Sequence, residues 1–232
     1  MPCAAPCARR AIPTTCPADE VQLVLVRHAL PERIHISDVA EADRPGGPAD
    51  PGLTELGERQ AARLVDALAP DDVAGLYVSP LARARGTAAP LAAVLGRDPE
   101  IVEDLREYDA DSDHYVPVHE MARLDPAAWE RMRAGLLPAY VDVPAFTARV
   151  DAAFEQIIAA HPGRETVVVV AHAGVMNTWL AHLLRLDRPL TFPLDYTGIT
   201  RILAGRDGRR VVRTVNEIAH VGDLLTLTAG TE

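Results

Sequence analysis

The sequence predicts an α/β fold, a three-layer α/β/α sandwich over a mainly parallel sheet with one inserted cap segment. Short apolar runs of strand length alternate along the chain with longer stretches of helical periodicity. This order is typical of a parallel sheet covered by helices. The alternation stops over residues 108–144, and we interpret that stretch as the inserted cap or lid. A chain of 232 residues is long enough to bury the core of one such domain.

The first nineteen residues differ in composition from the rest of the chain. Residues 1–19 are Pro-rich and contain all three cysteines, Cys3, Cys7 and Cys16. We therefore expect a disordered tail at 1–19 and a folded domain at 20–232 that has no disulfide framework. No apolar stretch reaches the roughly 20 residues of a membrane span. The first residues also lack the apolar run of a secretion signal, so a cytoplasmic location is expected.

The charge of the chain argues against two classes of partner. Lys and Arg total 23 against 33 Asp and Glu, which gives a net charge of −10, and every cationic side chain is an arginine. Such an acidic chain has no general basic field for nucleic acid or an anionic membrane, so neither is expected as a partner. Local arginine clusters can still bind a small anion. A homodimer, formed through an edge strand or the insertion, is one alternative for the oligomeric state.

The first elements can be justified in order. Residues 21–26 form a short apolar run, which is typical of a buried strand. Apolar residues recur at helical spacing over 53–68 and predict an amphipathic helix. A second apolar run predicts a strand at 73–78. The helix expected over 79–95 begins at a Ser-Pro pair, interpreted as an N-cap and a first-turn proline, and ends before a glycine.

The second half of the chain continues the pattern around the insertion. A short strand is expected at 100–103, a helix over about 118–134 inside the insertion, and another over 145–160. The β-branched run at 167–171 is the clearest strand of all, and a helix that ends at Leu186 follows it. The two last strands, joined by a glycine-containing turn, are expected at residues 197–203 and 211–216.

Polar side chains follow the predicted strands at the point where each strand ends. In open α/β sheets, sites form at these ends, so we expect these side chains to come together. They are Arg27, His28, Ser79, Arg83, Glu107 and His172. Neighbouring side chains in a strand point to opposite faces, so Arg27 and His28 share one site only if the chain leaves the strand there. Pro31 is consistent with such a departure.

These residue types suit phosphoryl chemistry. A guanidinium group holds a phosphoryl group with two parallel hydrogen bonds. A neutral imidazole can attack phosphorus, and a second, protonated imidazole can stabilise the phosphoryl oxygens. A carboxylic acid whose pKa is raised can protonate the leaving alkoxide.

The same residues lie in motifs that occur in a fixed order. These segments are Arg27-His28-Ala29, Leu53 to Ala61, Ser79 to Ala88, Leu105-Arg106-Glu107 and His172-Ala173-Gly174. Together they resemble the histidine phosphatase superfamily, in its branch of phosphoglycerate mutase-like phosphatases. The family patterns are Arg-His-Gly, Leu-Thr-x-x-Gly-x-x-Gln-Ala, Ser-x-x-x-Arg-Ala-x-x-Thr-Ala, Leu-x-Glu and His-Gly-Gly. The resemblance covers about residues 21–215 and implies a phosphoglycerate mutase-like fold.

The resemblance also implies roles for individual residues. His28 would be phosphorylated and Glu107 would be the proton donor, although Glu103 and Asp109 are nearby alternatives for the acid. The phosphate pocket would consist of Arg27, Arg83, His172 and the backbone N–H of Ala173. The implied substrate is a small phosphorylated metabolite, and no metal or organic cofactor is implied. Arg85, two residues beyond Arg83 on the same helix, is interpreted as a structural residue.

The departures from the family pattern keep alternatives open. Ala29 and Ala173 stand where the family has glycine, so a non-catalytic phospholigand-binding protein is one alternative. Phosphoglycerate mutase-type phosphoryl transfer is another. The segment after His28 lacks the Glu-x-x-x-Asn of the mutases, and the stretch at 108–113 is acidic, so hydrolysis is favoured. The loop at 30–52 and the insertion are expected to choose the substrate.

Some residues of the insertion have two interpretations. Asp109, Asp111, Asp113 and Glu120 have the spacing of a calcium loop, but His114 replaces the required glycine, so a substrate-facing lid is favoured. His114 and His119 are more simply surface residues than metal ligands. Four larger side chains recur at helical spacing and are interpreted as core packing, with a substrate pocket as the alternative. They are Trp129, Met132, Leu136 and Tyr140.

Overall fold

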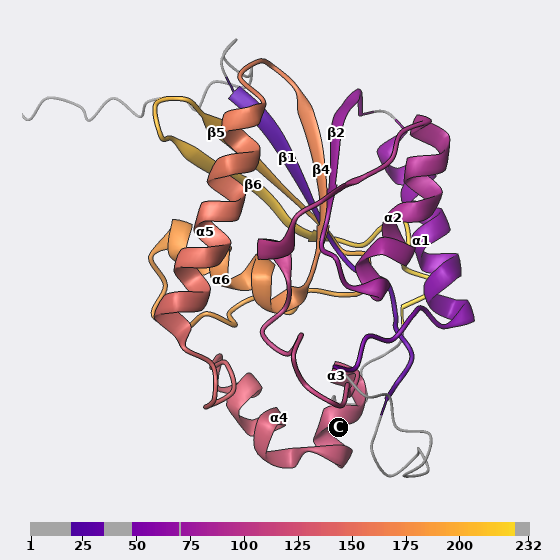
Figure 1. Ribbon diagram of the computed structural model, residues 1–232, viewed down its shortest axis with the longest axis vertical. Helices are drawn as coiled ribbons and strands as arrows, with labels where there is room; N and C mark the ends of the chain where they lie inside the picture. The colour runs from indigo at the N-terminus through magenta and orange to yellow at the C-terminus, as the bar shows by residue number, and fades with distance from the viewer. Residues whose placement is uncertain (1–19, 35–47, 70, 226–232) are drawn as a thin grey trace, which may run out of the picture.

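The structure is a computed structural model that describes residues 20–34, 48–69 and 71–225 (Figure 1). Six strands of this part of the chain form one sheet in the order β3-β2-β4-β1-β5-β6, with helices on both faces. The expected three-layer α/β sandwich is therefore confirmed. The expectations for the tail at 1–19 and its cysteines concern residues outside the described ranges.

The sheet is mostly parallel, as expected. Its strands are β1 (Glu20–Arg27), β2 (Val73–Val78), β3 (Glu100–Ile101), β4 (Thr166–Ala171), β5 (Ile199–Gly205) and β6 (Arg210–Glu217). The first four run parallel, whereas β5 is antiparallel to both β1 and β6. The carboxyl ends of β1, β2, β3 and β4 therefore meet at one edge of the sheet. β1 and β4 are the central strands, which explains why both are apolar runs without alternation.

Two pairs of helices cover the sheet. The helices are α1 (Glu55–Leu68), α2 (Ala82–Leu95), α3 (Val118–Leu124), α4 (Pro126–Arg133), α5 (Val143–Ala160) and α6 (Ala173–Leu184), with a 3₁₀ turn at Glu103–Leu105. One hydrophobic cluster joins α1 and α2 to the sheet, and a second joins α5 and α6 to its other face. In Figure 1 these two pairs flank the strands on opposite sides.

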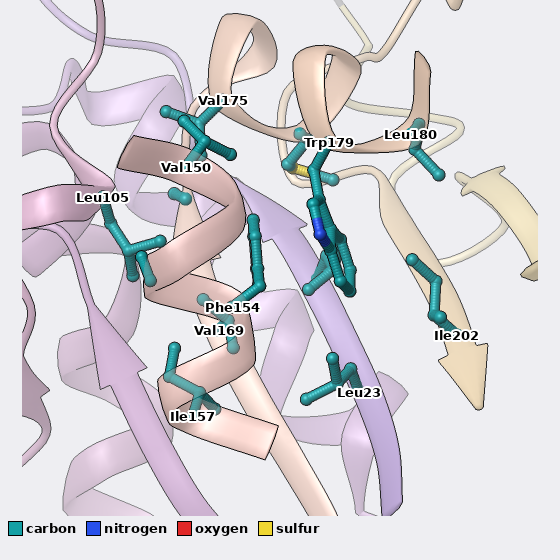
Figure 2. Close-up of a cluster of buried hydrophobic side chains, with 14 of the residues drawn as sticks. Leu23, Leu105, Val150, Phe154, Ile157, Val169, Val175, Trp179, Leu180 and Ile202 are labelled. Atoms are coloured by element: carbon teal, nitrogen blue, oxygen red, sulfur yellow. The ribbon is translucent and has the colours of Figure 1, made fainter. Parts of the chain in front are cut away.

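The larger cluster fixes α5 and α6 against the strands (Figure 2). The rings of Phe154 and Trp179 stack with centroids 4.0 Å apart, and both side chains are fully buried. Leu23 and Val169 supply the sheet side of the same cluster. Because α6 begins directly after β4, this packing fixes where the first residues of α6 lie.

Two expected helix boundaries are wrong. Ser79 is not the N-cap of α2, because the helix begins at Ala82 after Leu81 and no side chain caps it. The hydroxyl of Ser79 instead lies 2.7 Å from His172 Nε2. The helix expected over 118–134 is two helices, since Pro126 interrupts the backbone pattern there. The carboxylate of Asp125 caps the second of them through the backbone N–H of Ala128 at 3.0 Å.

The larger apolar side chains of the cap (residues 108–144) do not pack in the hydrophobic core, contrary to the interpretation of the sequence. Its two helices, α3 and α4, lie below the sheet in Figure 1, and neither contains a buried residue. Trp129 and Met132 belong to neither hydrophobic cluster, and Leu136 and Tyr140 are 38% and 71% exposed. The core-packing interpretation of these four residues is therefore wrong.

One general property of the helices can be added. Over the described residues, no helix is both long enough and apolar enough to cross a membrane.

Candidate active site

The structure brings the expected polar residues together at the carboxyl edge of the sheet. Arg27 is the last residue of β1 and His28 follows it, Arg83 lies in the first turn of α2, and His172 directly precedes α6. Glu107 follows the 3₁₀ turn. All five residues are 8% exposed or less. A cavity of about 390 Å³ is lined by four of them, and the ring of His172 lies 5.1 Å from that of His28.

One nitrogen of the His28 ring makes a hydrogen bond within the protein, and the other is available to a ligand in the cavity. Its Nδ1 lies 2.8 Å from the carbonyl oxygen of Ala29. A carbonyl oxygen only accepts, so Nδ1 carries the proton and Nε2 carries the lone pair. The chain leaves the strand here, because the backbone N–H of Ala29 donates to Thr87 Oγ1 at 2.8 Å. That departure allows Arg27 and His28 to share one site.

The charge state of His28 suits a nucleophile. Burial lowers the pKa of His28 well below its ordinary value, and the nearby charges of Arg83 and Arg27 lower it further. The imidazole is therefore neutral near pH 7, with a lone pair on Nε2.

Arg83 presents unused hydrogen-bond donors to the site. Its Nη2 donates to Asp109 Oδ1 at 3.0 Å, and its guanidinium carbon lies 4.6 Å from the ring centroid of Tyr115. Among the described residues, Nε and Nη1 have no hydrogen-bond partner although both are buried. A buried donor without a partner is costly, so these two atoms fit an anion in the cavity.

Arg27 is also fixed by its neighbours. Its guanidinium carbon lies 4.0 Å from the ring centroid of Tyr196, and Nη1 donates to the carbonyl of Leu194. The buried Nε of Arg27 has no partner within the described part of the chain. Two buried guanidinium groups thus hold unused donors next to one imidazole, which is an arrangement suited to a phosphoryl group.

Glu107 is held in a way that suits a proton donor. Its Oε2 accepts from the backbone N–H of Gly174 at 2.7 Å, and Oε1 accepts from that of Tyr108 at 3.1 Å. Burial raises the pKa of Glu107 to about 7 and the nearby charge of Asp109 adds to the rise, although the two backbone N–H donors and Arg83 act in the opposite direction. The alternatives for the acid are less suitable, because Glu103 is exposed and Asp109 is engaged with Arg83.

His172 is completely buried behind His28. Its Nε2 lies 2.7 Å from Ser79 Oγ, and its Nδ1 has no partner among the described residues. Burial lowers the pKa of His172 well below its ordinary value, followed by the charge of Arg83. The expected protonated imidazole is therefore not the form that these surroundings favour. A phosphate dianion beside it would favour the charged form.

The two alanines at the family's glycine positions have ordinary backbone conformations. Neither Ala29 nor Ala173 is among the described residues that have a positive φ, so a Cβ is tolerated at both. Ala173 is the first residue of α6 and borders the cavity, and its backbone N–H stays a predicted phosphate donor. Gly174 is the position that needs glycine, because a Cβ there would overlap Glu107 Oε1 and lie 2.7 Å from the ring of Tyr108.

Sequence patterns do not reveal the groups that position the two arginines. Asp109 was interpreted as part of a solvated lid, yet its side chain pairs with Arg83. Tyr115 and Tyr196 carried no signal, because the rings on which the arginines stack lie far from them in sequence. Within the described ranges, no cluster of His, Cys, Asp and Glu side chains could hold a metal ion. Asp111, part of the supposed calcium loop, pairs with Arg106 at 2.5 Å.

The sequence matches one family model over most of its length. The model is described as the histidine phosphatase superfamily (branch 1) and matches residues 23–217. A Mycobacterium tuberculosis protein, PE-PGRS family protein PE_PGRS11, is 30% identical over 181 residues, which is 68% of this chain and 31% of that protein. The chain spans between 31% and 60% of the length of the curated relatives that it matches.

Solved structures with the same fold include named phosphatases. Bacillus stearothermophilus YhfR matches with a TM-score of 0.66 and 27% identity, over 87% of this chain and 99% of that one. A mycobacterial glucosyl-3-phosphoglycerate phosphatase, solved with VO₃, matches with a TM-score of 0.65 and 24% identity, over 84% and 98% of the two chains. Phosphoserine phosphatase from Entamoeba histolytica matches with a TM-score of 0.63 and 21% identity, over 87% and 99%.

Proposed function

The chain belongs to the histidine phosphatase superfamily (branch 1), and from that membership we propose that it hydrolyses a small phosphomonoester through a phosphohistidine at His28. The observation that carries the proposal is the state of His28. Its Nδ1–H donates to Ala29, which leaves a neutral Nε2 lone pair beside the unused buried donors of Arg27 and Arg83. The carboxyl group of Glu107, whose pKa is raised to about 7, borders the same cavity.

The first step forms the phosphoenzyme. The Nε2 lone pair of His28 attacks phosphorus, and the bond between phosphorus and the ester oxygen breaks. Glu107 gives its proton to that oxygen, so the alcohol leaves neutral and Glu107 becomes a carboxylate. The unused N–H donors of Arg27 and Arg83 stabilise the charge that develops on the phosphoryl oxygens.

The second step returns the site to its starting state. The Glu107 carboxylate takes a proton from water, and the water oxygen attacks phosphorus. The bond between phosphorus and His28 Nε2 breaks, and its electron pair returns to the imidazole. Inorganic phosphate leaves, and Glu107 is protonated again for the next cycle.

Two alternatives have less support. The binding-protein alternative rests on Ala29 and Ala173, which stand at glycine positions of the family. Both residues have ordinary backbone angles, so this reason for the alternative no longer holds. Mutase-type transfer needs a site for a second, strongly anionic group. The loop after Glu107 instead carries Asp109, Asp111 and Asp113.

The test combines steady-state turnover with trapping of the phosphoenzyme. We expect wild-type protein to hydrolyse 4-nitrophenyl phosphate in the presence of a chelator, and His28→Ala to lose this turnover. His182→Ala removes an exposed histidine of α6 and should keep it. With this substrate the leaving group needs no proton, so Glu107→Gln should give a burst of nitrophenol followed by slow turnover. The trapped phosphate should be labile in acid and stable in alkali.

The results that would overturn the proposal are specific. Turnover that persists in His28→Ala would exclude the phosphohistidine. Turnover without any trapped phosphate in Glu107→Gln would exclude the two-step mechanism. Transfer of phosphate to a second phosphoglycerate, faster than its release to water, would make the protein a mutase.

A further inference from the structure

The cavity beside the phosphate-binding residues has an apolar wall, and the part of this wall that the cap supplies belongs to no hydrophobic core. The cap supplies Val118, Met121, Trp129 and Met132 to this wall. All four are half-buried, and none is a member of either core cluster. The segment between α6 and β5 adds further apolar side chains, namely Leu190, Phe192, Pro193 and Leu194. Apolar surface left facing a cavity gains free energy when an apolar group covers it.

Three polar side chains that line this part of the cavity have partners within the protein, whereas the buried hydroxyl of Tyr196 has none among the described residues. The amide group of Asn177 donates to the Phe192 carbonyl at 3.0 Å and accepts from its N–H at 2.8 Å. The carboxylate of Asp195 accepts from Asn216 Nδ2 at 2.8 Å. The hydroxyl of Thr191 donates to a backbone carbonyl at 2.7 Å. These groups therefore hold the wall in place and do not depend on hydroxyl groups of a substrate.

The charges around the outer part of the cavity do not favour a second anion. Arg133 is the cap's only cation on the described wall, and it lies 3.4 Å from the carboxylate of Glu130. An adjoining cavity of about 440 Å³ is lined by three carboxylates, those of Asp109, Asp111 and Asp125. A carboxylate carried by the substrate would approach these groups at a cost.

Resting on the proposed hydrolysis, we propose that this site takes phosphomonoesters of apolar alcohols, with an alkyl or aryl group that packs against the cap wall. The phosphoryl group lies between Arg27 and Arg83, and the organic group covers Trp129 and Met132. A cavity of about 390 Å³ has room for an organic group of several carbon atoms. The structural relatives named for phosphoserine and glucosyl-3-phosphoglycerate act on esters that carry a carboxylate, so these compounds are the competing class.

The test is a series of alkyl phosphates whose alcohols have similar acidity. Ethyl, butyl and hexyl phosphate differ in apolar surface and hardly in intrinsic reactivity. Burial of one methylene changes binding about fourfold, so kcat/KM should rise by about fourfold for each methylene that the wall covers. Phosphoserine and 3-phosphoglycerate should be poorer substrates than butyl phosphate.

Two variants test whether the dependence of kcat/KM on alkyl chain length comes from the cap. Trp129→Ala should reduce kcat/KM for hexyl phosphate at least about tenfold while it changes the value for ethyl phosphate little. Val94→Ala, at the end of α2 that is remote from Arg83, shortens a side chain that is 67% exposed and should leave the values for the whole series unchanged. Because Trp129 belongs to no core cluster, its variant should keep the melting temperature of the wild type.

The failures of the two proposals can be told apart. Suppose that the protein hydrolyses 4-nitrophenyl phosphate. Equal kcat/KM values for the three alkyl phosphates, or a preference for the carboxylate-bearing esters, then overturn this inference and leave the phosphatase proposal intact. Without turnover of any ester, the phosphatase proposal fails. Titration with ethyl-, butyl- and hexylphosphonate then decides this inference by affinity, since binding that strengthens with chain length supports the apolar wall and equal affinities overturn it.

Discussion

At the scale of single residues, the properties of the site depend on how many partners each buried charged group has. Arg83 has one carboxylate partner, Asp109, and two unused donors. Asp109 in turn acts on Glu107, because a negative charge beside a buried carboxyl group favours its protonated form. In the proposed mechanism, Asp109 is therefore a positioning residue that acts on both Arg83 and Glu107.

The first prediction concerns the pH dependence set by Asp109. In the proposed mechanism phosphorylation needs protonated Glu107, so kcat/KM should fall as pH rises through the pKa of Glu107, near 7. In Asp109→Asn the like charge is gone, the pKa of Glu107 falls, and this fall in activity should occur at lower pH. The measurement is kcat/KM against pH with an alkyl phosphate, whose leaving group needs the proton.

Asp111→Asn is the matched control for that experiment. Asp111 lies on the same loop, but its side chain is 86% exposed and pairs with Arg106. Its profile should coincide with that of the wild type. Equal shifts in both variants would show that the loop's net charge is responsible, and Asp109 would lose its special role.

The second prediction concerns the stability cost of the proton donor. The pKa of Glu107 is raised from 4.5 to about 7, so between these values the folded protein binds more protons than the unfolded chain. Stability therefore falls as pH rises through this range, by at most about 3 kcal/mol. Glu107→Gln cannot ionise, so its melting temperature relative to the wild type should be more favourable at pH 8 than at pH 5.

Glu103→Gln separates this effect from a general change in charge. Glu103 is exposed and lies in the same segment of the chain. Its melting temperature relative to the wild type should differ little between pH 5 and pH 8. If both glutamine variants showed the same trend, burial of Glu107 would not be its cause.

At the scale of elements, the end of β4 and the start of α6 hold the acid in place. The N–H of Gly174, in the first turn of α6, donates to Glu107 Oε2. α6 is fixed in turn by the packing of Trp179 on Phe154 (Figure 2). The backbone of this turn therefore sets the position of a side chain that lies in another part of the sequence.

The third prediction tests this close approach. In Gly174→Ala, the new Cβ would overlap the Glu107 carboxylate and displace it. Loss of a positioned general acid typically costs about 10²- to 10⁴-fold, so kcat/KM for an alkyl phosphate should fall by at least about a hundredfold. Ala173→Gly changes the neighbouring residue in the opposite direction and should retain most activity. A fall of the same size in both variants would point to disruption of the helix.

The sequence predicted most of the elements but not how they end. Alternation of apolar runs and amphipathic stretches gave every strand, because buried strands and helices have different periods. The Ser79 cap was wrong because a sequence pattern cannot tell that a distant histidine competes for the hydroxyl. The split at Pro126 was missed although proline signals it. Asp109 was missed because an acidic run is normally solvated, and only the folded chain shows its pairing with Arg83.

At the scale of the whole molecule, the proposed phosphate-binding residues join segments that are distant in sequence. Arg27 comes from β1, Arg83 from α2 and His172 from the start of α6. An anion bound between them therefore links elements on both faces of the sheet, and it binds the folded state alone. Such a ligand stabilises the fold by mass action.

The fourth prediction follows from this linkage. Orthovanadate or phosphate at about 100 times its Kd should raise the melting temperature by roughly 5–10 °C. Arg83→Ala should abolish most of that rise, because it removes the unused donors. Arg85→Ala removes an exposed arginine of the same helix and should keep it. A shift that survives in Arg83→Ala, or that disappears in both variants, would place the anion elsewhere.

The central place of β1 in the sheet has a consequence for how the protein is made. β1 is synthesised before the other strands of the sheet, yet it pairs with β4 and β5, where Gln22 lies opposite Thr166 and Leu203. While the ribosome adds the intervening residues, both hydrogen-bonding edges of this apolar strand remain unpaired. Open apolar edges of this kind favour aggregation. A nascent chain that stalls before β5 is therefore expected to bind chaperones, and the sheet closes only when β5 has emerged.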